Sequence, residues 1–376
     1  MKNIKEILEL ANHFLDQLET KNGYKLFIRS DCSPYARCFV IFTKSLLKDN
    51  LWLDSRKTRL ISDLNDDLYD FYNIQLGKTI DIKFDKPFLQ LFCFTLSALN
   101  ILNGSLSGKN LKILEFFLNL KVEELMIARS VNLGLPGSGN YSMFLAVLNI
   151  YAQEKLDEDR SLEIKKWLKF NLNSVNDNGF WGNFPKINHL QFQNGYHQYE
   201  IFEYLAVHKA PWNQAAKSTL TLADQIGHFS PYPGGGGCYD FDAIFLLTSD
   251  FVDDIGQNMI LNKSLETIIS EQNKDGGFCE SKLLRDHNNW PRLLSLVSHI
   301  HSQPSHLKLS SLRIGLNLFR FKHKTVSTHW TSIDRKWNES NAWDTFFRLS
   351  AIFRIYSYLG LPEKELFKVN HFPGIG

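Results

Sequence analysis

Long apolar segments alternate with amphipathic segments along this chain. The segments LQLFCFTLSALNIL, YSMFLAVLNIY and DTFFRLSAIFRIY are apolar on nearly every side, which is typical of buried helices. The segments between them have one charged face and one apolar face, which indicates helices at a surface. These amphipathic segments cover residues 3–20, 53–73, 108–128, 157–174, 212–226, 257–273 and 304–320.

A short pattern marks the start of each apolar segment, where one side chain is followed three residues later by Phe. It begins at Ala36, Leu91, Tyr141, Tyr199, Asp242 and Asp344, with Pro291 and Leu294 as a degenerate copy. The copies recur at intervals of roughly 50 residues, which indicates a repeated pair of helices. We therefore expect an all-α fold. In it, about seven inner and seven outer helices close into an α/α toroid, and residues 1–376 form a single domain.

The links between these helices have unequal lengths. Links from an inner helix to the next outer helix are short, as at residues 208–211 and 302–304. The opposite links are long and rich in Gly and aromatic residues: NDNGFWGNFPKINHLQFQNGY, GHFSPYPGGGGCY, KDGGFCESKLLRDHNN and KHKTVSTHWTSIDRKWNESN. In a ring of antiparallel pairs these long links share one rim with the N-termini of the inner helices. We expect the functional pocket on that rim.

Charge and cysteine content restrict the possible binding partners and the cellular compartment of the protein. The chain has 42 Lys and Arg against 40 Asp and Glu, a net charge of +2. This balance argues against nucleic acid and favours a small molecule or an oligosaccharide as substrate. The five cysteines contain no C-x-x-C pair, and acids interrupt the N-terminal MKNIKEILEL, so we expect free thiols and a cytoplasmic protein. No apolar run approaches the roughly 20 residues that cross a bilayer. A peripheral membrane contact is compatible with the sequence.

Two long links resemble the QW-type repeat of the terpene cyclase and protein prenyltransferase superfamily. The first runs from Gln272 to Phe278 as QNKDGGF, and the second runs from Asn176 to Trp181 as NDNGFW. In that superfamily the Gln caps a helix and the aromatic residue packs beside it, which fastens neighbouring helix pairs. The resemblance implies a toroid of the squalene-cyclase type.

The resemblance also implies a catalytic acid. Class II cyclases of this superfamily carry a D-x-D-D-T-A motif, and residues 239–244 of this chain read YDFDAI. The position that maps onto the acid, which protonates an alkene or epoxide, is Asp242. Asp240 would raise its pKa by repulsion of like charges, while Ala243 stands where the family has a further Asp. The alternative is that Asp240 and Asp242 only cap the helix after Gly234–Gly237.

A second group of polar residues begins another inner helix. His197, Tyr199 and Glu200 lie within one helical turn, so a general acid and a general base could come from them. The alternative is a hydrogen-bonded structural cluster.

Aromatic and polar residues in or beside the long links are candidates for substrate binding. Aromatic faces there could stabilise a carbocation or stack on a sugar, and filling the core is the alternative. Asp344 also fits a simple ion pair with Arg348 on the same helix. The residues proposed to contact substrate are Tyr141, Trp181, Tyr239, His287, Trp290, Trp343 and Asp344.

Two patterns are similar to metal sites, although we expect neither a metal nor another cofactor. Cys238 and Asp240, with the later His287, resemble in reversed order the zinc ligands of protein prenyltransferase β subunits. Residues 66–70 read DDLYD, like the magnesium-diphosphate motif of class I terpene synthases. They lie on the polar face of an amphipathic segment, so we interpret them as a solvated surface.

Three functions compete on this sequence. The first is a terpene-cyclase-like enzyme that performs acid-initiated cyclisation or isomerisation of a prenyl-type substrate. The second is a carbohydrate-active toroid, a lyase, hydrolase or epimerase, with Asp242, Glu200, His197 and Tyr199 as acid and base. The third is a binding ring without catalysis.

Overall fold

The protein is helical throughout the part that the structure describes. The computed structural model describes residues 3–78, 81–128, 130–182, 186–284, 290–303, 305–320, 325–368 and 372–375. The chain is 62% helix and 3% strand, with 15 α-helices in these ranges. The predicted all-α class is confirmed.

The chain divides into two compact units. Unit 1 contains residues 1–48, 186–189 and 212–368, and unit 2 contains residues 49–185, 190–211 and 369–376. The closed ring and the single domain stay predictions of the sequence.

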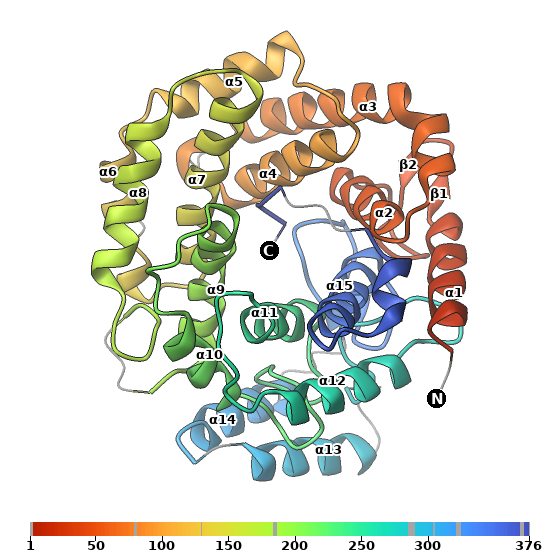
Figure 1. Ribbon diagram of the computed structural model, residues 1–376. Coiled ribbons are helices and arrows are strands. Elements are labelled where there is room, and N and C mark those ends of the chain that lie inside the picture. Colours follow the sequence, from red (N-terminus) through yellow and green to blue (C-terminus); the bar gives the residue numbers. More distant parts are fainter. Residues whose placement is uncertain are drawn as a thin grey trace. The chain divides into compact units, whose positions relative to one another are not determined.

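Unit 1 is built around three buried helices that pack on one another. Helix α15 packs against α11 and α2, and α10 and α12 pack on α11 and α15 respectively (Figure 1). Two short antiparallel hairpins, which the sequence pattern does not predict, pair β1 with β2 and β3 with β4. The elements are α1 (Ile4–Gln17), β1 (Glu19–Thr20), β2 (Gly23–Tyr24), α2 (Pro34–Leu46), α10 (Trp212–Leu220), α11 (Gly237–Leu247), α12 (Asn258–Ser270), α13 (Trp290–Ser302), α14 (Lys308–Arg320), β3 (Thr325–Val326), β4 (Arg335–Lys336), α15 (Ala342–Tyr358) and the 3₁₀ helix η3 (Pro362–Leu366).

Unit 2 has the same alternation of buried and half-exposed helices. Helix α4 packs between α3 and α7, and α8 packs on α6 and α7. The elements are α3 (Asn50–Leu76), η1 (Ile82–Phe84), α4 (Lys86–Ile101), α5 (Gly108–Leu118), α6 (Val122–Ala128), η2 (Val131–Leu133), α7 (Ser138–Lys155), α8 (Ser161–Ser174) and α9 (His189–Tyr204), whose first residue belongs to unit 1.

Each predicted helical segment contains a helix, with two differences. The segment 108–128 is two helices, because α5 ends at Leu118, whose carbonyl accepts a hydrogen bond from Arg160 Nη2 at 2.7 Å. The predicted inner helix at Pro291 is not buried on all sides, because α13 exposes Leu294 and Val297 to solvent. That part of the prediction is wrong.

The long links of unit 1 meet beside the N-terminal turns of α11 and α15. Ser281 joins two of them, since its backbone N donates to Trp337 O and its Oγ donates to Pro233 O. Asn341 N donates to Phe278 O, and Ala342 N donates to Leu26 O. Within unit 1 the predicted convergence of the long links is confirmed.

The QW-like link fastens its neighbours in unit 1. Gln272 Nε2 donates to Ile7 O of α1 and to Gly276 O, both at 2.8 Å. Phe278 is fully buried, and its backbone N donates to Thr345 Oγ1 of α15. The link therefore joins the end of α12 to α1 and α15.

No helix in the described ranges combines the length and the apolar character that a bilayer crossing requires.

Candidate active site

Helix α11 begins beside four consecutive glycines, against which charged side chains pack closely. Gly235 has a φ of +61°, and a Cβ there would lie 2.3 Å from Asp240 Oδ2 and 2.6 Å from His228 Nδ1. A Cβ at Gly236 would lie 2.6 Å from Glu280 Oε1. A side chain at either position would displace members of two polar clusters, and at Gly235 the positive φ adds backbone strain.

Asp240 and Asp242 do not cap α11, so the capping alternative is wrong. The residue before the helix is Gly236, and no side chain caps the first turn. Asp240 lies one turn inside the helix, where its Oδ1 accepts a hydrogen bond from Phe229 N at 2.8 Å. Both carboxyl groups are buried.

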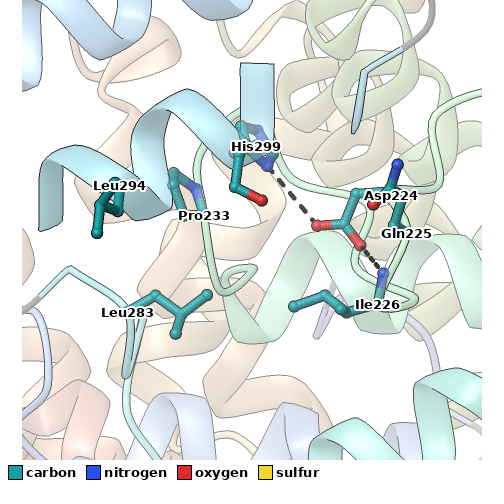
Figure 2. A pocket seen from close by; sticks show the side chains of 8 residues that line it. Asp224, Gln225, Ile226, Pro233, Leu283, Leu294 and His299 are labelled. Carbon is teal, nitrogen blue, oxygen red and sulfur yellow. Dashed lines mark hydrogen bonds and ion pairs between the residues drawn. The ribbon is translucent and has the colours of Figure 1, made fainter. Parts of the chain in front are cut away.

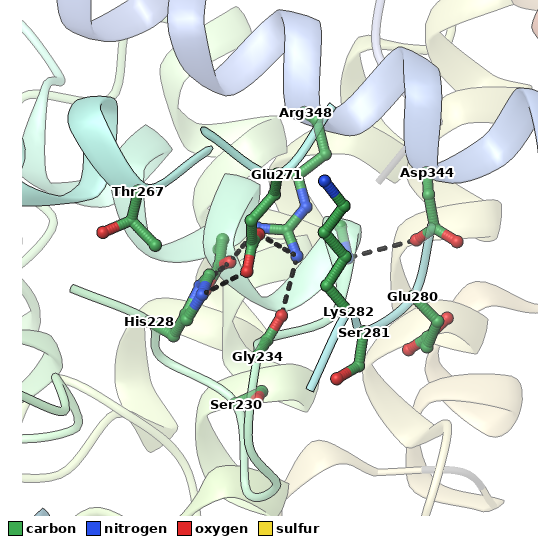
Figure 3. A network of polar contacts seen from close by, with 12 residues as sticks. His228, Ser230, Gly234, Thr267, Glu271, Glu280, Ser281, Lys282, Asp344 and Arg348 are labelled. Atoms are coloured by element: carbon green, nitrogen blue, oxygen red, sulfur yellow. Dashed lines mark hydrogen bonds and ion pairs between the residues drawn. The ribbon is translucent and has the colours of Figure 1, made fainter. Parts of the chain in front are cut away.

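Asp240 belongs to a buried ionic network, formed by His228, Asp240, Glu271 and Arg348. His228 Nδ1 lies 2.7 Å from Asp240 Oδ2, and His228 Nε2 lies 3.1 Å from Glu271 Oε1. Arg348 on α15 contacts Asp240 through Nη1, and its Nη2 lies 3.5 Å from Glu271 Oε2 and donates to Gly234 O at 3.0 Å. Figure 3 shows His228, Glu271 and Arg348 pointing toward one another. The network ties α11, α15 and the end of α12 together.

The pKa shifts of two members of this network keep them charged. Burial lowers the pKa of His228, but Asp240 and Glu271 outweigh burial and raise it to about 10. Burial raises the pKa of Asp240, but His228 and Arg348 bring it below its ordinary value. His228 is therefore an imidazolium and Asp240 a carboxylate at neutral pH. Because two cations share the charge of Asp240, its repulsion of Asp242 is weaker than the sequence suggested.

The ion pair predicted between Asp344 and Arg348 on one helix is not formed. Arg348 reaches across to Asp240, while Asp344 Oδ2 lies 3.8 Å from Arg335 Nη2. The reason is that α11 packs against α15 and places a buried carboxylate within reach of Arg348. This interpretation of the sequence was wrong.

A second polar group, the carboxyl cluster, consists of Asp242, Glu280 and Asp344. Burial and the charges of these three carboxyl groups together raise the pKa of the Cys238 thiol. All three carboxyl groups therefore lie close enough to Cys238 to affect it. Glu280 Oε2 lies 2.5 Å from Arg335 Nη2. The three carboxyl groups come from α11, from the link after α12 and from the first turn of α15.

Asp344 is held at the start of α15 by two donors. Its Oδ1 accepts a hydrogen bond from Gly237 N at 3.2 Å, and its Oδ2 accepts one from Asn341 Nδ2 at 2.6 Å. Asn341 in turn caps α15, since its Oδ1 accepts a hydrogen bond from Asp344 N. The carboxyl group is fixed in place and fully buried.

The pKa of Asp344 is raised toward neutral pH. Burial and the neighbouring Glu280 raise the pKa of Asp344 to about 6, against the opposing effect of Arg335. A carboxyl group with such a pKa can give up a proton near neutral pH, which an ordinary Asp cannot.

Aromatic side chains continue from the carboxyl cluster along α15. A Cβ at Gly237 would lie 2.8 Å from Asp344 Oδ1 and 3.3 Å from Phe347 Cβ, so both side chains adjoin this glycine. The Phe347 ring centroid lies 5.2 Å from that of Phe241 and 4.4 Å from that of Trp343. Trp343 continues the series with Trp330 and Phe39. Phe241 is partly exposed, so the series reaches the surface of α11.

A pocket of about 300 Å³ opens elsewhere in unit 1. Asp224 and His299 face each other there, with His299 Nδ1 3.6 Å from Asp224 Oδ2, and Asp224 Oδ1 accepts from Ile226 N (Figure 2). The lining residues are Asp224, Gln225, Ile226, Pro233, Leu283, Leu294, Ser298 and His299. Sequence reasoning missed Asp224 and His299 as pocket residues.

The predicted group on α9 lies in unit 2, and its side chains have separate partners. His197 Nε2 lies 2.9 Å from Asn140 Nδ2, and burial together with Lys86 lowers the pKa of His197 to about 3. Tyr199 Oη donates to Gly179 O at 2.6 Å, and burial raises its pKa. Glu200 Oε1 accepts from the backbone N of Gly374 and Ile375. These contacts support the structural alternative for the group.

Two predicted substrate contacts in unit 2 are also bonded to the backbone. Trp181 is buried against Tyr199, and its Nε1 donates to Asn171 O at 3.0 Å. Tyr141 Oη donates to Phe84 O at 2.7 Å.

The magnesium-like motif is a surface, as predicted. Asp66 and Asp70 are exposed on α3, while Leu64 and Leu68 on the opposite side are buried.

The remaining predicted residues belong to unit 1. Tyr239 is partly exposed beside the carboxyl cluster, with its ring edge-on to Tyr232. His287 lies outside the described residues, and the same holds for the side chain of Trp290, whose backbone begins α13. The expectation that Cys238, Asp240 and His287 hold no metal therefore stays a prediction.

Sequence reasoning did not name five members of the two polar clusters as site residues, although it considered Arg348 as an ion-pair partner of Asp344. Each lies in a long link, at a helix end or in the second turn of a helix. For Glu280, Arg335 and His228 the available signal was a link rich in Gly and aromatic residues. The missed residues are His228, Glu271, Glu280, Arg335 and Arg348.

Comparisons of this chain with family models, with curated proteins and with solved structures find no match.

Proposed function

We propose that this chain is a terpene-cyclase-like enzyme in which Asp344 donates a proton to a prenyl-type substrate and so starts a cyclisation or isomerisation. One observation carries the proposal. Asp344 is a buried carboxyl group with a pKa of about 6, and it lies beside Phe347 at the end of an aromatic series. The α/α toroid is part of the same proposal, as the scaffold that such enzymes share.

In the proposed reaction the Asp344 O–H bond breaks and its proton forms a C–H bond with one carbon of an alkene. The other alkene carbon becomes a carbocation and Asp344 a carboxylate. Arg335, 3.8 Å away, would stabilise that carboxylate. Loss of a proton from a carbon next to the cation, to Asp242 or back to Asp344, gives a new double bond and leaves the protons in balance.

The aromatic series supports this substrate class. The faces of Phe241, Phe347 and Trp343 are negative, and cations above such faces are stabilised by about 0.5–2 kcal/mol each. A cationic hydrocarbon intermediate suits this kind of wall, because an aromatic face stabilises the cation without forming a bond to it.

A second candidate, a carbohydrate-active enzyme, is supported by the pocket at Asp224 and His299. That pocket holds about 300 Å³ and is lined by several polar side chains, which suits a sugar ring better than a prenyl chain.

Product analysis tests the two candidates. The purified full chain is incubated separately with a linear polyprene, with prenyl diphosphates and with acidic oligosaccharides, and the products are identified by mass spectrometry. The proposal expects a product of unchanged mass from the polyprene, and its loss in Asp344→Asn. Asp250→Asn, an exposed carboxyl group on the same unit, is the matched control and should keep full activity.

Two results would overturn the assignment. Turnover of an oligosaccharide that depends on Asp224 and His299 would favour the second candidate. Polyprene turnover that survives in a folded Asp344→Asn would remove Asp344 from the reaction.

We also place the enzyme in a reducing compartment such as the cytoplasm, and the free state of all five cysteines supports this.

A further inference from the structure

Helices α13 and α14 present an exposed apolar face, defined by five residues. On α14 the exposed residues are spaced by three and four positions, which places them on one side of the helix. On α13 the spacing of Leu294 and Val297 is the same. Leu294 is 64% exposed and Leu309 is 60% exposed. The apolar face consists of Leu294, Val297, Leu309, Leu312 and Leu316.

The opposite sides of both helices pack against the rest of unit 1 and against each other. Leu296 of α13 is buried with Leu284 and Trp337, and Ile314 of α14 packs against the same cluster. Gly315 brings the two helices together beside Leu296.

The sequence of this part of the chain carries charges of one sign. Residues 287–333 contain no Asp or Glu, although the rest of the chain has more acidic than basic residues. Lys308 and Arg313 are exposed on α14 next to the apolar face. The basic residues of this segment are Arg292, Lys308, Arg313, Arg320, Lys322 and Lys324.

We propose that the α13–α14 apolar face binds the surface of membranes that contain anionic phospholipids. Exposed leucines on a helix with flanking cations and no acids match the two requirements of such a surface. The apolar side chains enter the boundary between headgroups and acyl chains, and the cations remain at the phosphates. This inference does not depend on the proposed reaction.

Other partners fit these features less well. Nucleic acid would bind the cations through its phosphates, but it has no apolar surface for the leucines to contact. A protein partner would match the leucines, but it does not explain why 47 consecutive residues of a nearly neutral chain lack an acid.

Vesicle flotation with the full chain tests the proposal. Vesicles contain phosphatidylcholine alone or with about 30% phosphatidylserine. Wild type should float with the anionic vesicles and bind the neutral ones at least about tenfold more weakly. Leu309→Gln/Leu312→Gln/Leu316→Gln should lose about tenfold or more of the anionic binding, and so should Lys308→Glu/Arg313→Glu.

Two matched variants control for the number and type of changes. Leu51→Gln/Ile127→Gln/Leu162→Gln alters three other exposed apolar residues, and Lys165→Glu/Lys169→Glu alters two other exposed cations. Both should bind as wild type does. If the triple Leu variant fails to fold, the Lys308/Arg313 pair decides the question.

Several results would overturn the proposal. They are absence of vesicle binding by wild type, equal binding to neutral vesicles, or equal loss in the control variants. Binding to duplex DNA without binding to vesicles would indicate a nucleic-acid surface. Self-association that the Leu variant abolishes, without vesicle binding, would indicate a protein interface.

Discussion

Replacing Arg348 with Met removes the cation that joins α15 to the ionic network. Arg348 is fully buried, and its guanidinium contacts the carboxylates of Asp240 and Glu271 and the carbonyl of Gly234. Met fills a similar space without charge, so the variant leaves two buried carboxylates facing a single cation, His228. The fold should become less stable because these buried charges lose the cation that compensates them.

The expected loss follows from burial. Removing one partner of a buried ion pair costs about 3–5 kcal/mol of unfolding free energy, and Arg348 has two carboxylate partners. Removing one partner of an exposed ion pair of the same chemistry costs only about 0–1 kcal/mol of unfolding free energy. Arg29, whose side chain is 49% exposed and pairs with Glu339 at 2.6 Å, offers that comparison. We expect Arg348→Met to lose at least about 3 kcal/mol and Arg29→Met less than about 1 kcal/mol.

Urea unfolding followed by far-ultraviolet circular dichroism measures both variants. A pH series adds a second check. In wild type the pKa of Asp240 is depressed, so its stabilising contribution is present at neutral pH and is lost as the pH falls through that low pKa. Without Arg348 the pKa of Asp240 rises, and protonation then relieves the buried charge. The stability gap between variant and wild type should therefore narrow from pH 7 toward about pH 5.

Equal losses in Arg348→Met and Arg29→Met would refute this reasoning, because burial would then not set the cost. A gap that widens at lower pH would refute the assigned protonation of Asp240.

Three further predictions concern unit 1 and the thiols. Gly235→Ala should destabilise the protein by more than about 2 kcal/mol, whereas Gly256→Ala, which has a similar positive φ but open space around it, should cost only about 1 kcal/mol in urea unfolding. His228 has a raised pKa of about 10. The stability it contributes is therefore complete below its unfolded pKa and falls as the pH rises toward 10, and urea midpoints of His228→Gln should lose this slope. Alkylation of the unfolded chain without reductant should modify five cysteines by mass, and a shortfall of two would show a disulfide.

The helices could be predicted from the sequence because their positions depend on local patterns. Apolar segments such as residues 344–356 are buried in α15 nearly throughout, as expected from a helix that is apolar on every side. The burial of helix α13 could not be predicted in this way, because its sequence has Leu both at a buried position and at a solvent-exposed one. The outward side of α13 is known only once its neighbours are in place.

The site could be predicted only in part. Convergence of the long links follows from the alternation of helices, and it placed Asp240, Asp242, Tyr239 and Asp344 correctly in one region of unit 1. The partners of these residues could not be inferred. Arg348 has a carboxylate one turn away in sequence, yet it contacts Asp240 on another helix, because helix packing decides which charges meet.

The sequence also could not identify which Asp is the proposed catalytic acid. The pKa of Asp344 depends on burial and on Glu280, which comes from a distant link, so no local motif marks it. Asp242, which the motif favours, stays a candidate for the base or for a second proton donor.

The central claim is that the pKa of Asp344 is raised to about 6, well above that of an ordinary Asp, and infrared difference spectroscopy tests it most directly. A protonated carboxyl group has a C=O stretching band that disappears when it ionises, and subtraction of the Asp344→Asn spectrum isolates the band of this residue. We predict a band at pH 5 that is lost with a midpoint near the raised pKa of about 6. A carboxyl group already ionised at pH 5 would contradict the account.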